Sequence, residues 1–207
     1  MLQYSTVEPA TLAVLIKLMA MPELSSFYLV GGTALALYYG HRKSVDIDLF
    51  STVDFSAEAL IPIIEKHFSD FAYSRPNNIG IFGFIGEIKV DFVRYQLHPM
   101  IGAPIFEESI RLMSIEDIMA MKVAAILKRA VKKDFWDIAE LLNEYTIDQV
   151  IKNYYRKYPN QQLLISIPQA LTYFEEAEES EQPISLKGQT WKKVQQKIQK
   201  SVAQYLK

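Results

Sequence analysis

The stretch FYLVGGTALALYYGHRKSVDIDLF, residues 27–50, decides the fold of this chain. A short apolar run at 27–30 ends at a glycine pair, and a helix-like run closed by Gly40 follows. Residues 45–50 then alternate acidic and apolar side chains, which is the period of a half-buried strand. The order strand, glycine turn, short helix, strand predicts an α/β unit.

Two aspartates in the second of these strands are candidates for a metal site. Asp46 and Asp48 are two residues apart, so on a strand they point to the same side. The intervening and flanking apolar residues are expected to face the core: Val45, Ile47 and Leu49. Two like charges this close repel each other, and a divalent cation removes that cost. Mg²⁺ prefers one or two carboxylates together with substrate phosphates, so the strand predicts an Mg²⁺ or Mn²⁺ site. An Asp-x-Asp pair alone also occurs in loops and helix caps.

The glycine pair and the threonine after it predict a phosphate-binding turn. Gly31, Gly32 and Thr33 stand between a strand and a helix, where backbone N–H groups can approach a phosphate at the helix N-terminus. A lone glycine pair is only a turn in most proteins. The order of the elements places this one beside the acidic strand, which favours a triphosphate bound next to a metal.

Two blocks of the sequence resemble a known family. Residues 27–50 resemble the signature of the DNA polymerase beta-like nucleotidyltransferases and, more narrowly, of the AbiEii/AbiGii-type nucleotidyltransferase toxin family. Arg42 and Ser44 match that family's Arg-x-Ser-x-Asp-x-Asp run. The stretch EDIMAMKVAAILKRAVKKDFWDIAELL, residues 116–142, resembles its second block, a helix carrying Lys and Arg followed by Lys/Arg-Asp-aromatic-aromatic-Asp. Residues 146–207 match nothing in the family pattern.

The resemblance implies a third carboxylate on an adjacent strand. Asp91 is the best match, and Glu87 on the same face is the reserve. In two-metal chemistry such a residue helps to deprotonate the attacking hydroxyl. A surface acid paired with Lys89 is the alternative interpretation.

The second block implies the cationic side of the site. Lys122 would be a clamp on the triphosphate with Arg129 as its support, since residues seven apart share a helix face. Substitution of Lys122 by Ala is then expected to weaken NTP binding with little change in melting temperature. The alternative is that both are bases at the edge of a buried helix. Asp134 matches the family's acid and would orient Lys122 or a nucleobase, or cap a helix. Asp137 is expected to be structural.

Composition and missing motifs exclude several classes of protein. The chain has 207 residues, of which 50% are hydrophobic and 22% charged, the balance of a folded protein. It has no cysteine, which excludes disulfides and thiolate zinc sites. No zinc-protease spacing, nucleophile elbow or P-loop occurs. No apolar run is long enough for a membrane span and no signal peptide is apparent, so we expect a cytoplasmic protein without a membrane partner.

Periodicity predicts two lobes, and their charges differ: an acidic front half suits a cation site and a basic rear half suits phosphates, unless the charges are scattered by chance. Residues 1–110 carry seven Lys/Arg against twelve Asp/Glu, and residues 111–207 carry fifteen against twelve. We expect 1–110 to be a catalytic lobe, a small mixed sheet flanked by helices, and 111–207 a helical lobe closing over the NTP. Strands are predicted at 27–30, 45–50, 71–74, 79–85 and 88–95. Helices are predicted at 7–20, 33–39, 56–68, 114–131, 133–145, 148–157, 160–176 and from 190 onward.

The last predicted helix is basic. From Thr190 to the end there are five lysines and no acid, and its apolar residues form one stripe. The lysines would therefore lie on the exposed side and could contact nucleic-acid phosphates. The alternative is that they dock on the glutamate-rich run at 175–181.

These observations predict a metal-dependent nucleotidyltransferase that moves a nucleoside monophosphate from an NTP to an acceptor. The family resemblance implies RNA, tRNA in particular, as the acceptor, growth inhibition as the outcome, and an antitoxin encoded nearby as the partner. An aminoglycoside-type small-molecule transferase is one alternative. A non-catalytic binding or regulatory protein on the same fold is another.

Overall fold

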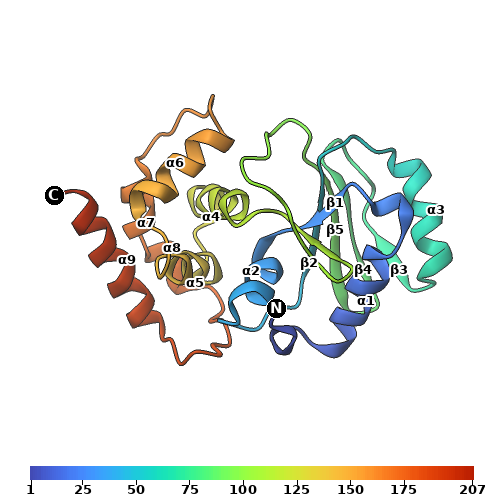
Figure 1. Cartoon of the computed structure of the whole chain (residues 1–207), viewed down its shortest axis with the longest axis horizontal. Coiled ribbons are helices and arrows are strands. Elements are labelled where there is room, and N and C mark those ends of the chain that lie inside the picture. Colours follow the sequence, from blue (N-terminus) through green and yellow to red (C-terminus); the bar gives the residue numbers. More distant parts are fainter.

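The sheet is the framework of the molecule, and a computed structural model describes it together with all 207 residues of the chain. Its seven strands follow the order β3-β4-β5-β2-β1-β7-β6 (Figure 1). The neighbours β1 and β7, and β2 and β5, are parallel, while the other neighbours are antiparallel. The predicted mixed sheet is confirmed. The strands are β1 Phe27–Leu29, β2 Ile47–Ser51, β3 Phe71–Tyr73, β4 Gly80–Ile85, β5 Ile88–Arg94, β6 Ile105–Glu107 and β7 Ile110–Leu112.

The helices divide into those around the sheet and those that form a separate group. In Figure 1, α1 and α3 lie beside the sheet, α4 to α9 gather at the other end, and α2 lies between the two. Single 3-10 turns occur at Tyr4–Thr6 and Pro22–Leu24. The helices are α1 Pro9–Met19, α2 Gly31–Tyr39, α3 Ala57–His67, α4 Ile115–Arg129, α5 Lys132–Leu141, α6 Ile147–Lys157, α7 Ile167–Thr172, α8 Glu175–Glu178 and α9 Trp191–Tyr205.

One continuous core joins the two groups. A single cluster of 51 buried apolar residues includes side chains of the sheet, such as Phe92, and of the helices, such as Leu35 and Trp136. The division expected after residue 110 falls within β7, so the helical part continues directly from the sheet. The site between the two parts is therefore built on one packed body.

Local signals placed several helix ends correctly. α2 ends at Gly40, which has the left-handed conformation (φ 67°) of a helix C-cap. The side chains of Ser114 and Thr190 accept hydrogen bonds from the first turns of α4 and α9. α3 starts after Ser56 as predicted and continues through Pro62.

Four expectations were wrong. β2 begins at Ile47, and Val45 is 56% exposed instead of facing the core, because the chain before the strand is tied to α2. No helix spans 160–176: a Ser166 capping box starts α7 only at 167. Ile16, expected on the buried stripe of α1, is 41% exposed. The strands β6 and β7 were not predicted; they lie in the stretch 96–113, which had been given no secondary structure.

None of the helices is both long and apolar enough to cross a membrane.

Candidate active site

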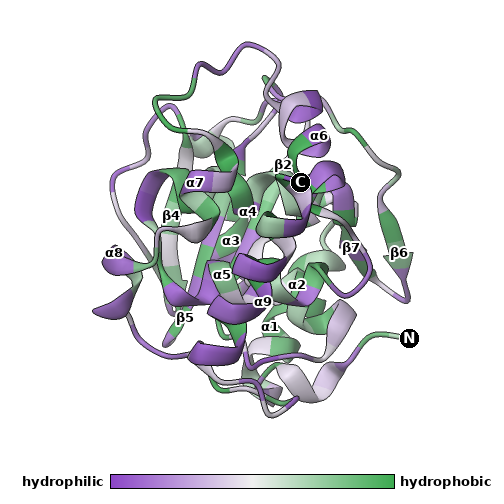
Figure 2. Cartoon of the chain, turned by 90° about the vertical axis from the view of Figure 1, so that its left-hand side faces the viewer, coloured by the Kyte–Doolittle hydropathy of each residue, from purple (hydrophilic) through white to green (hydrophobic).

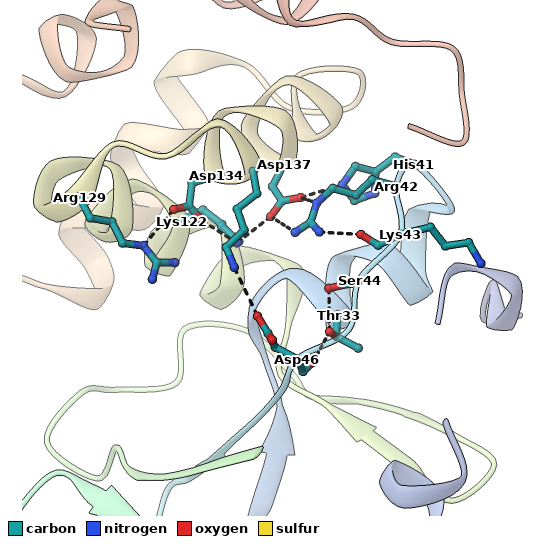
Figure 3. Close-up of polar contacts among 11 residues, drawn as sticks. Thr33, His41, Arg42, Lys43, Ser44, Asp46, Lys122, Arg129, Asp134 and Asp137 are labelled. Atoms are coloured by element: carbon teal, nitrogen blue, oxygen red, sulfur yellow. Dashed lines mark hydrogen bonds and ion pairs between the residues drawn. The ribbon is translucent and has the colours of Figure 1, made fainter. Parts of the chain in front are cut away.

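A cleft between α2, the start of β2 and the helices α4 and α5 contains the predicted site (Figure 3). All the predicted site residues except Asp91 line it: Gly31, Gly32, Thr33, Arg42, Ser44, Asp46, Asp48, Lys122, Arg129 and Asp134. They come from two stretches that are far apart in the sequence, 31–48 and 122–134. The tertiary structure therefore brings the glycine turn, the acidic strand and the second block together.

The two aspartates, two residues apart in one chain segment, face this cleft. Asp46 lies just before β2, with 32% of its side chain exposed, and its Oδ2 is 3.3 Å from Nζ of Lys133. Asp48 lies within β2. Burial raises the pKa of the Asp48 carboxyl, and the charges of Asp91 and Asp46 raise it further, against the opposing charge of Lys89. A carboxyl in this setting is stabilised in its ionised form by a neighbouring cation.

Asp91 is the neighbour of Asp48 in the sheet. The two residues are directly paired in the parallel register of β2 and β5. Lys89 donates from Nζ to Oδ2 of Asp91 at 2.5 Å, as the surface-pair alternative foresaw. However, Asp91 is only 7% exposed, and its Oδ1 is buried without a hydrogen-bond partner. The reserve residue Glu87 is exposed in the turn between β4 and β5 and does not line the cleft.

The donor set fits a cation that is shared with a substrate. No group of three or more His, Cys, Asp or Glu side chains is arranged to hold a metal by itself. Asp46 and Asp48 supply two carboxylates to one cleft, which is the number that Mg²⁺ uses when phosphates complete its coordination. The free Oδ1 of Asp91 leaves a further acceptor next to Asp48. The residues therefore suit an Mg²⁺–NTP complex better than a permanent all-protein metal cage.

Both positions of the glycine pair need a residue without a Cβ, because the side chains of Asp48 and Arg42 lie against them, and Gly31 also has a left-handed conformation. Gly31 has φ +70°, and a Cβ there would lie 2.4 Å from Oδ2 of Asp48. A Cβ on Gly32 would lie 2.1 Å from Nη2 of Arg42. No side chain caps the N-terminus of α2, so its first N–H groups are free to meet an anion. The pair thus makes room for Asp48 and Arg42 and leaves an uncapped helix N-terminus beside them.

Substitution of Gly31 by Ala tests this arrangement. We expect it to lower the free energy of unfolding by roughly 1–3 kcal/mol, the cost of an unfavourable backbone conformation. We also expect it to weaken NTP binding, because the new Cβ displaces the Asp48 carboxylate. Gly188→Ala is the matched control: Gly188 has φ +64° with nothing within 4 Å of a Cβ. Urea denaturation and NTP titration measure both effects, and equal loss of NTP affinity in the two variants would contradict the assignment.

The hydroxyls of Thr33 and Ser44 are engaged within the protein. Thr33 Oγ1 lies 2.8 Å from Oγ of Ser44 and donates to the backbone carbonyl of Asp46. Thr33 is 1% exposed and Ser44 is 9% exposed. These contacts fix the chain before β2 on α2 and so orient Asp46.

A buried ionic cluster lies behind the cleft, with Asp137 at its centre (Figure 3). Its carboxylate accepts two hydrogen bonds from Arg42: Nε donates to Oδ1 at 2.7 Å and Nη2 donates to Oδ2 at 2.9 Å. Nζ of Lys122 lies 2.6 Å away, and Nε2 of His41 lies 2.8 Å away. Burial opposes ionisation, but Arg42 and Lys122 hold the pKa of Asp137 well below its usual range. Asp137 therefore joins the 41–42 segment to α4 and α5, which agrees with its expected structural role.

Lys122 is part of the same cluster. Its Nζ is 2.9 Å from Oδ1 of Asp134, whose Oδ2 accepts from Nε of Arg129 at 3.2 Å. Burial by itself lowers the pKa of Lys122, but Asp137 and Asp134 outweigh it and raise that pKa above its ordinary value. The structure therefore argues against the expectation that Lys122→Ala scarcely changes the melting temperature, and predicts a lower one instead. Loss of this ammonium leaves buried carboxylate charge with less compensation, which is strongly destabilising.

Two other cations of the cleft are open to solvent. The side chain of Arg129 is 54% exposed and that of Lys133 is 44% exposed. Lys133 was not among the predicted site residues, although it is the basic residue directly before Asp134 in the second block. The Lys/Arg position of that block is the sequence signal from which Lys133 could have been predicted. Arg42, by contrast, is only 3% exposed and donates to Asp137 and a backbone carbonyl.

Comparison with solved structures shows which fold the chain shares. The chain superposes on MenT4, a nucleotidyltransferase toxin of Mycobacterium tuberculosis H37Rv, with a TM-score of 0.54 and 14% identity over 92% of this chain and 82% of that one. The antibiotic-resistance factor ANT(2'')-Ia superposes with a TM-score of 0.55 and 16% identity, over 71% of this chain and 91% of that one. JHP933 of Helicobacter pylori superposes with a TM-score of 0.53 and 14% identity, over 96% of this chain and 94% of that one. All three likenesses are below 25% identity, and they show that the chain has the fold of these proteins.

The family follows from the sequence match. Residues 14–204 match the family described as nucleotidyl transferase AbiEii toxin, type IV TA system. The protein belongs to this family of nucleotidyltransferase toxins. It is also 30% identical to the protein aq_aa25 of Aquifex aeolicus (strain VF5) over 207 residues, 92% of this chain and 93% of that one. The match confirms the resemblance and extends it over residues 146–204, which the two sequence blocks had left unassigned.

Proposed function

We propose that this protein transfers a nucleoside monophosphate from an NTP to a hydroxyl group of RNA, tRNA in particular, with a divalent cation held by Asp46 and Asp48. One observation carries the proposal: these two carboxylates and the uncapped N-terminus of α2 line the same cleft. A cation and a triphosphate placed there neutralise each other beside the protein groups that favour each of them. Asp91, next to Asp48, is the proposed third carboxylate.

Two kinds of protein group would bind the triphosphate: groups that contact its oxygens directly, and a buried cation that contributes charge from the wall of the cleft. The N–H groups at Gly31 and Gly32 and the exposed cations Arg129 and Lys133 are free to contact phosphate oxygens. Lys122 contributes charge from the wall of the cleft while Asp134 and Asp137 fix its position. Preorganised cations of this kind stabilise charge that develops on a leaving pyrophosphate.

The proposed reaction is a displacement at the α-phosphorus. The acceptor hydroxyl oxygen forms a bond to that phosphorus, the bond from it to the oxygen bridging the β-phosphate breaks, and pyrophosphate leaves. The hydroxyl proton passes to a carboxylate of the adjacent pair Asp48 and Asp91. A bound Mg²⁺ or Mn²⁺ supplies charge neutralisation on the phosphates and makes the hydroxyl more acidic.

The surface of α9 supports a nucleic-acid acceptor. Its lysines at 192, 193, 197 and 200 form no ion pair with the glutamates of 175–181. Glu178 instead accepts from Nε1 of Trp191 at 2.8 Å and from Nε2 of Gln195 at 3.0 Å. Figure 2 shows hydrophilic residues along the outward side of α9. A basic helix face without acidic partners favours phosphates as its ligand.

Membership of a toxin family further suggests a separately encoded antitoxin as a protein partner.

Labelling experiments test the proposal. We expect incubation with each labelled NTP and total RNA to transfer label from one preferred nucleotide to RNA. Chelation by EDTA is expected to abolish this transfer and excess Mg²⁺ or Mn²⁺ to restore it, because two carboxylates alone repel the triphosphate. Transfer that persists in excess EDTA would contradict the metal assignment. Label that appears only in small molecules would instead identify a small-molecule transferase.

A further inference from the structure

A second hollow opens onto Asp46 from a different side of the cleft. It shares Arg42, Ser44, Asp46 and Lys133 with the first cavity, so the two adjoin at these residues. It does not reach Gly31–Thr33, where the triphosphate is placed. Arg42 and Ser44 are buried and already bonded within the protein, so Asp46 and Lys133 are the polar groups that face both spaces.

The far wall of this groove comes from the segment between α8 and α9. Lys43 donates its backbone N–H to the carbonyl of Ile184 at 2.9 Å, and Leu186 donates to that of His41 at 2.9 Å. An antiparallel bridge pairs Arg42 with Ser185 between these two bonds. The backbone of 181–186 is therefore fixed beside the 41–45 segment, while the side chains of Gln182 and Ile184 remain exposed.

We propose that this groove binds the nucleotide of the acceptor RNA that carries the attacking hydroxyl. The inference rests on the proposed function, and it identifies the side from which the acceptor hydroxyl reaches the α-phosphorus. In phosphoryl transfer the attacking and leaving oxygens lie roughly in line on opposite sides of the phosphorus. With pyrophosphate leaving toward α2, the attacking hydroxyl must come from a space that meets Asp46 away from Gly31–Thr33. The groove is that space.

The chemistry of the walls fits a nucleotide. Val45 is 56% exposed and Ile184 is 68% exposed, so an aliphatic side chain on each wall is free to cover the faces of a base or ribose. The side chains of Lys43 and Lys133 are 31% and 44% exposed at the same groove. Lys43 pairs with Glu8 at 3.2 Å and Lys133 with Asp46 at 3.3 Å, and these accessible pairs can open to meet an acceptor phosphate. The carboxylate of Glu181 also lines the groove and can accept from a ribose hydroxyl or a base amine. The amide of Gln182 makes no hydrogen bond within the protein and can both donate to and accept from a base edge.

Substitution of Ile184 by Asp tests the groove without touching the metal or triphosphate groups. The backbone pairing of residue 184 does not depend on its side chain, so the melting temperature is expected to stay within about 2 °C. We expect KM for RNA to rise about tenfold or more, through lost stacking surface and repulsion of phosphate, with the Kd for NTP unchanged. Ile165→Asp, at an isoleucine that is 47% exposed and outside the groove, is the matched control.

The outcomes separate this inference from the function on which it rests. If the unmodified protein transfers nucleotide to RNA and Ile184→Asp leaves KM for RNA unchanged, or Ile165→Asp raises it equally, the groove assignment is wrong and the function stands. If the unmodified protein binds NTP but labels no RNA, both are wrong. If label enters a small molecule and Ile184→Asp raises KM for that molecule, the groove binds an acceptor of another class and the RNA assignment is overturned.

Discussion

Asp48→Asn is expected to abolish nucleotide transfer while leaving the fold intact. The substitution removes one of the two carboxylates that face the cleft, and a metal ion contributes several kcal/mol of transition-state stabilisation. The expected loss in kcat is therefore on the order of a thousandfold or more. In the metal-free protein, the same change removes a charge that Asp46 and Asp91 repel, so the free energy of unfolding should be unchanged or higher.

Thermal melting and transfer assays on the same preparations check both parts. Mg²⁺ with NTP is expected to raise the melting temperature of the unmodified protein and to have little effect on Asp48→Asn. Asp148→Asn is a suitable control, because Asp148 is exposed and forms only a surface ion pair with Lys152. Full transfer activity in Asp48→Asn would show that this carboxylate does not hold the catalytic cation.

Asp137→Ala is expected to be the most destabilising single substitution in the ionic cluster. It would leave His41, Arg42 and Lys122 buried without the carboxylate that they share. Removal of one partner from a buried ion pair costs roughly 3–5 kcal/mol. For a chain of this length that corresponds to a fall in melting temperature of roughly 6–20 °C. Activity should fall as well, because Arg42 would no longer hold the 41–46 segment against α5.

Two comparisons separate this effect from an ordinary surface change. Asp148→Ala removes a carboxylate from an exposed pair and is expected to change the free energy of unfolding by no more than about 1 kcal/mol. Asp137→Asn keeps the shape and some of the hydrogen bonds, so its melting temperature should lie between those of Asp137→Ala and the unmodified protein. Similar melting temperatures for Asp137→Ala and Asp148→Ala would refute the central role of Asp137.

The cluster also explains why Lys122 and the exposed cations have different roles. Lys122 is held by Asp134 and Asp137, so its position is fixed before a substrate arrives. Lys133 has a single partner, Asp46, at 3.3 Å and remains largely accessible. Fixed charge suits stabilisation of a transition state, while a mobile side chain suits capture of the substrate.

The sequence by itself determined the local parts of this protein. A glycine pair between a strand and a helix, two aspartates two residues apart, and the Lys-Asp-Phe-Trp-Asp run beginning at Lys133 are patterns within a few residues. Helix ends at Ser56, Ser114 and Thr190 were equally readable, because a cap is a contact between residues three apart. These signals were enough for the fold class, the family and the polar residues of the cleft except Lys133.

Only the tertiary structure decided how those residues share the work. Burial and ion pairing depend on which distant segments pack together, and no local period encodes that. Lys122 was expected to be a clamp on the triphosphate, but the packing of α4 on α5 buries it against the carboxylates of Asp134 and Asp137. Pairing of β2 with β5 placed Asp91 beside Asp48, and docking of 181–186 on 41–45 built the second groove. The sequence determines the chemical type of each side chain, but its electrostatic surroundings depend on residues from distant parts of the chain that the fold packs around it.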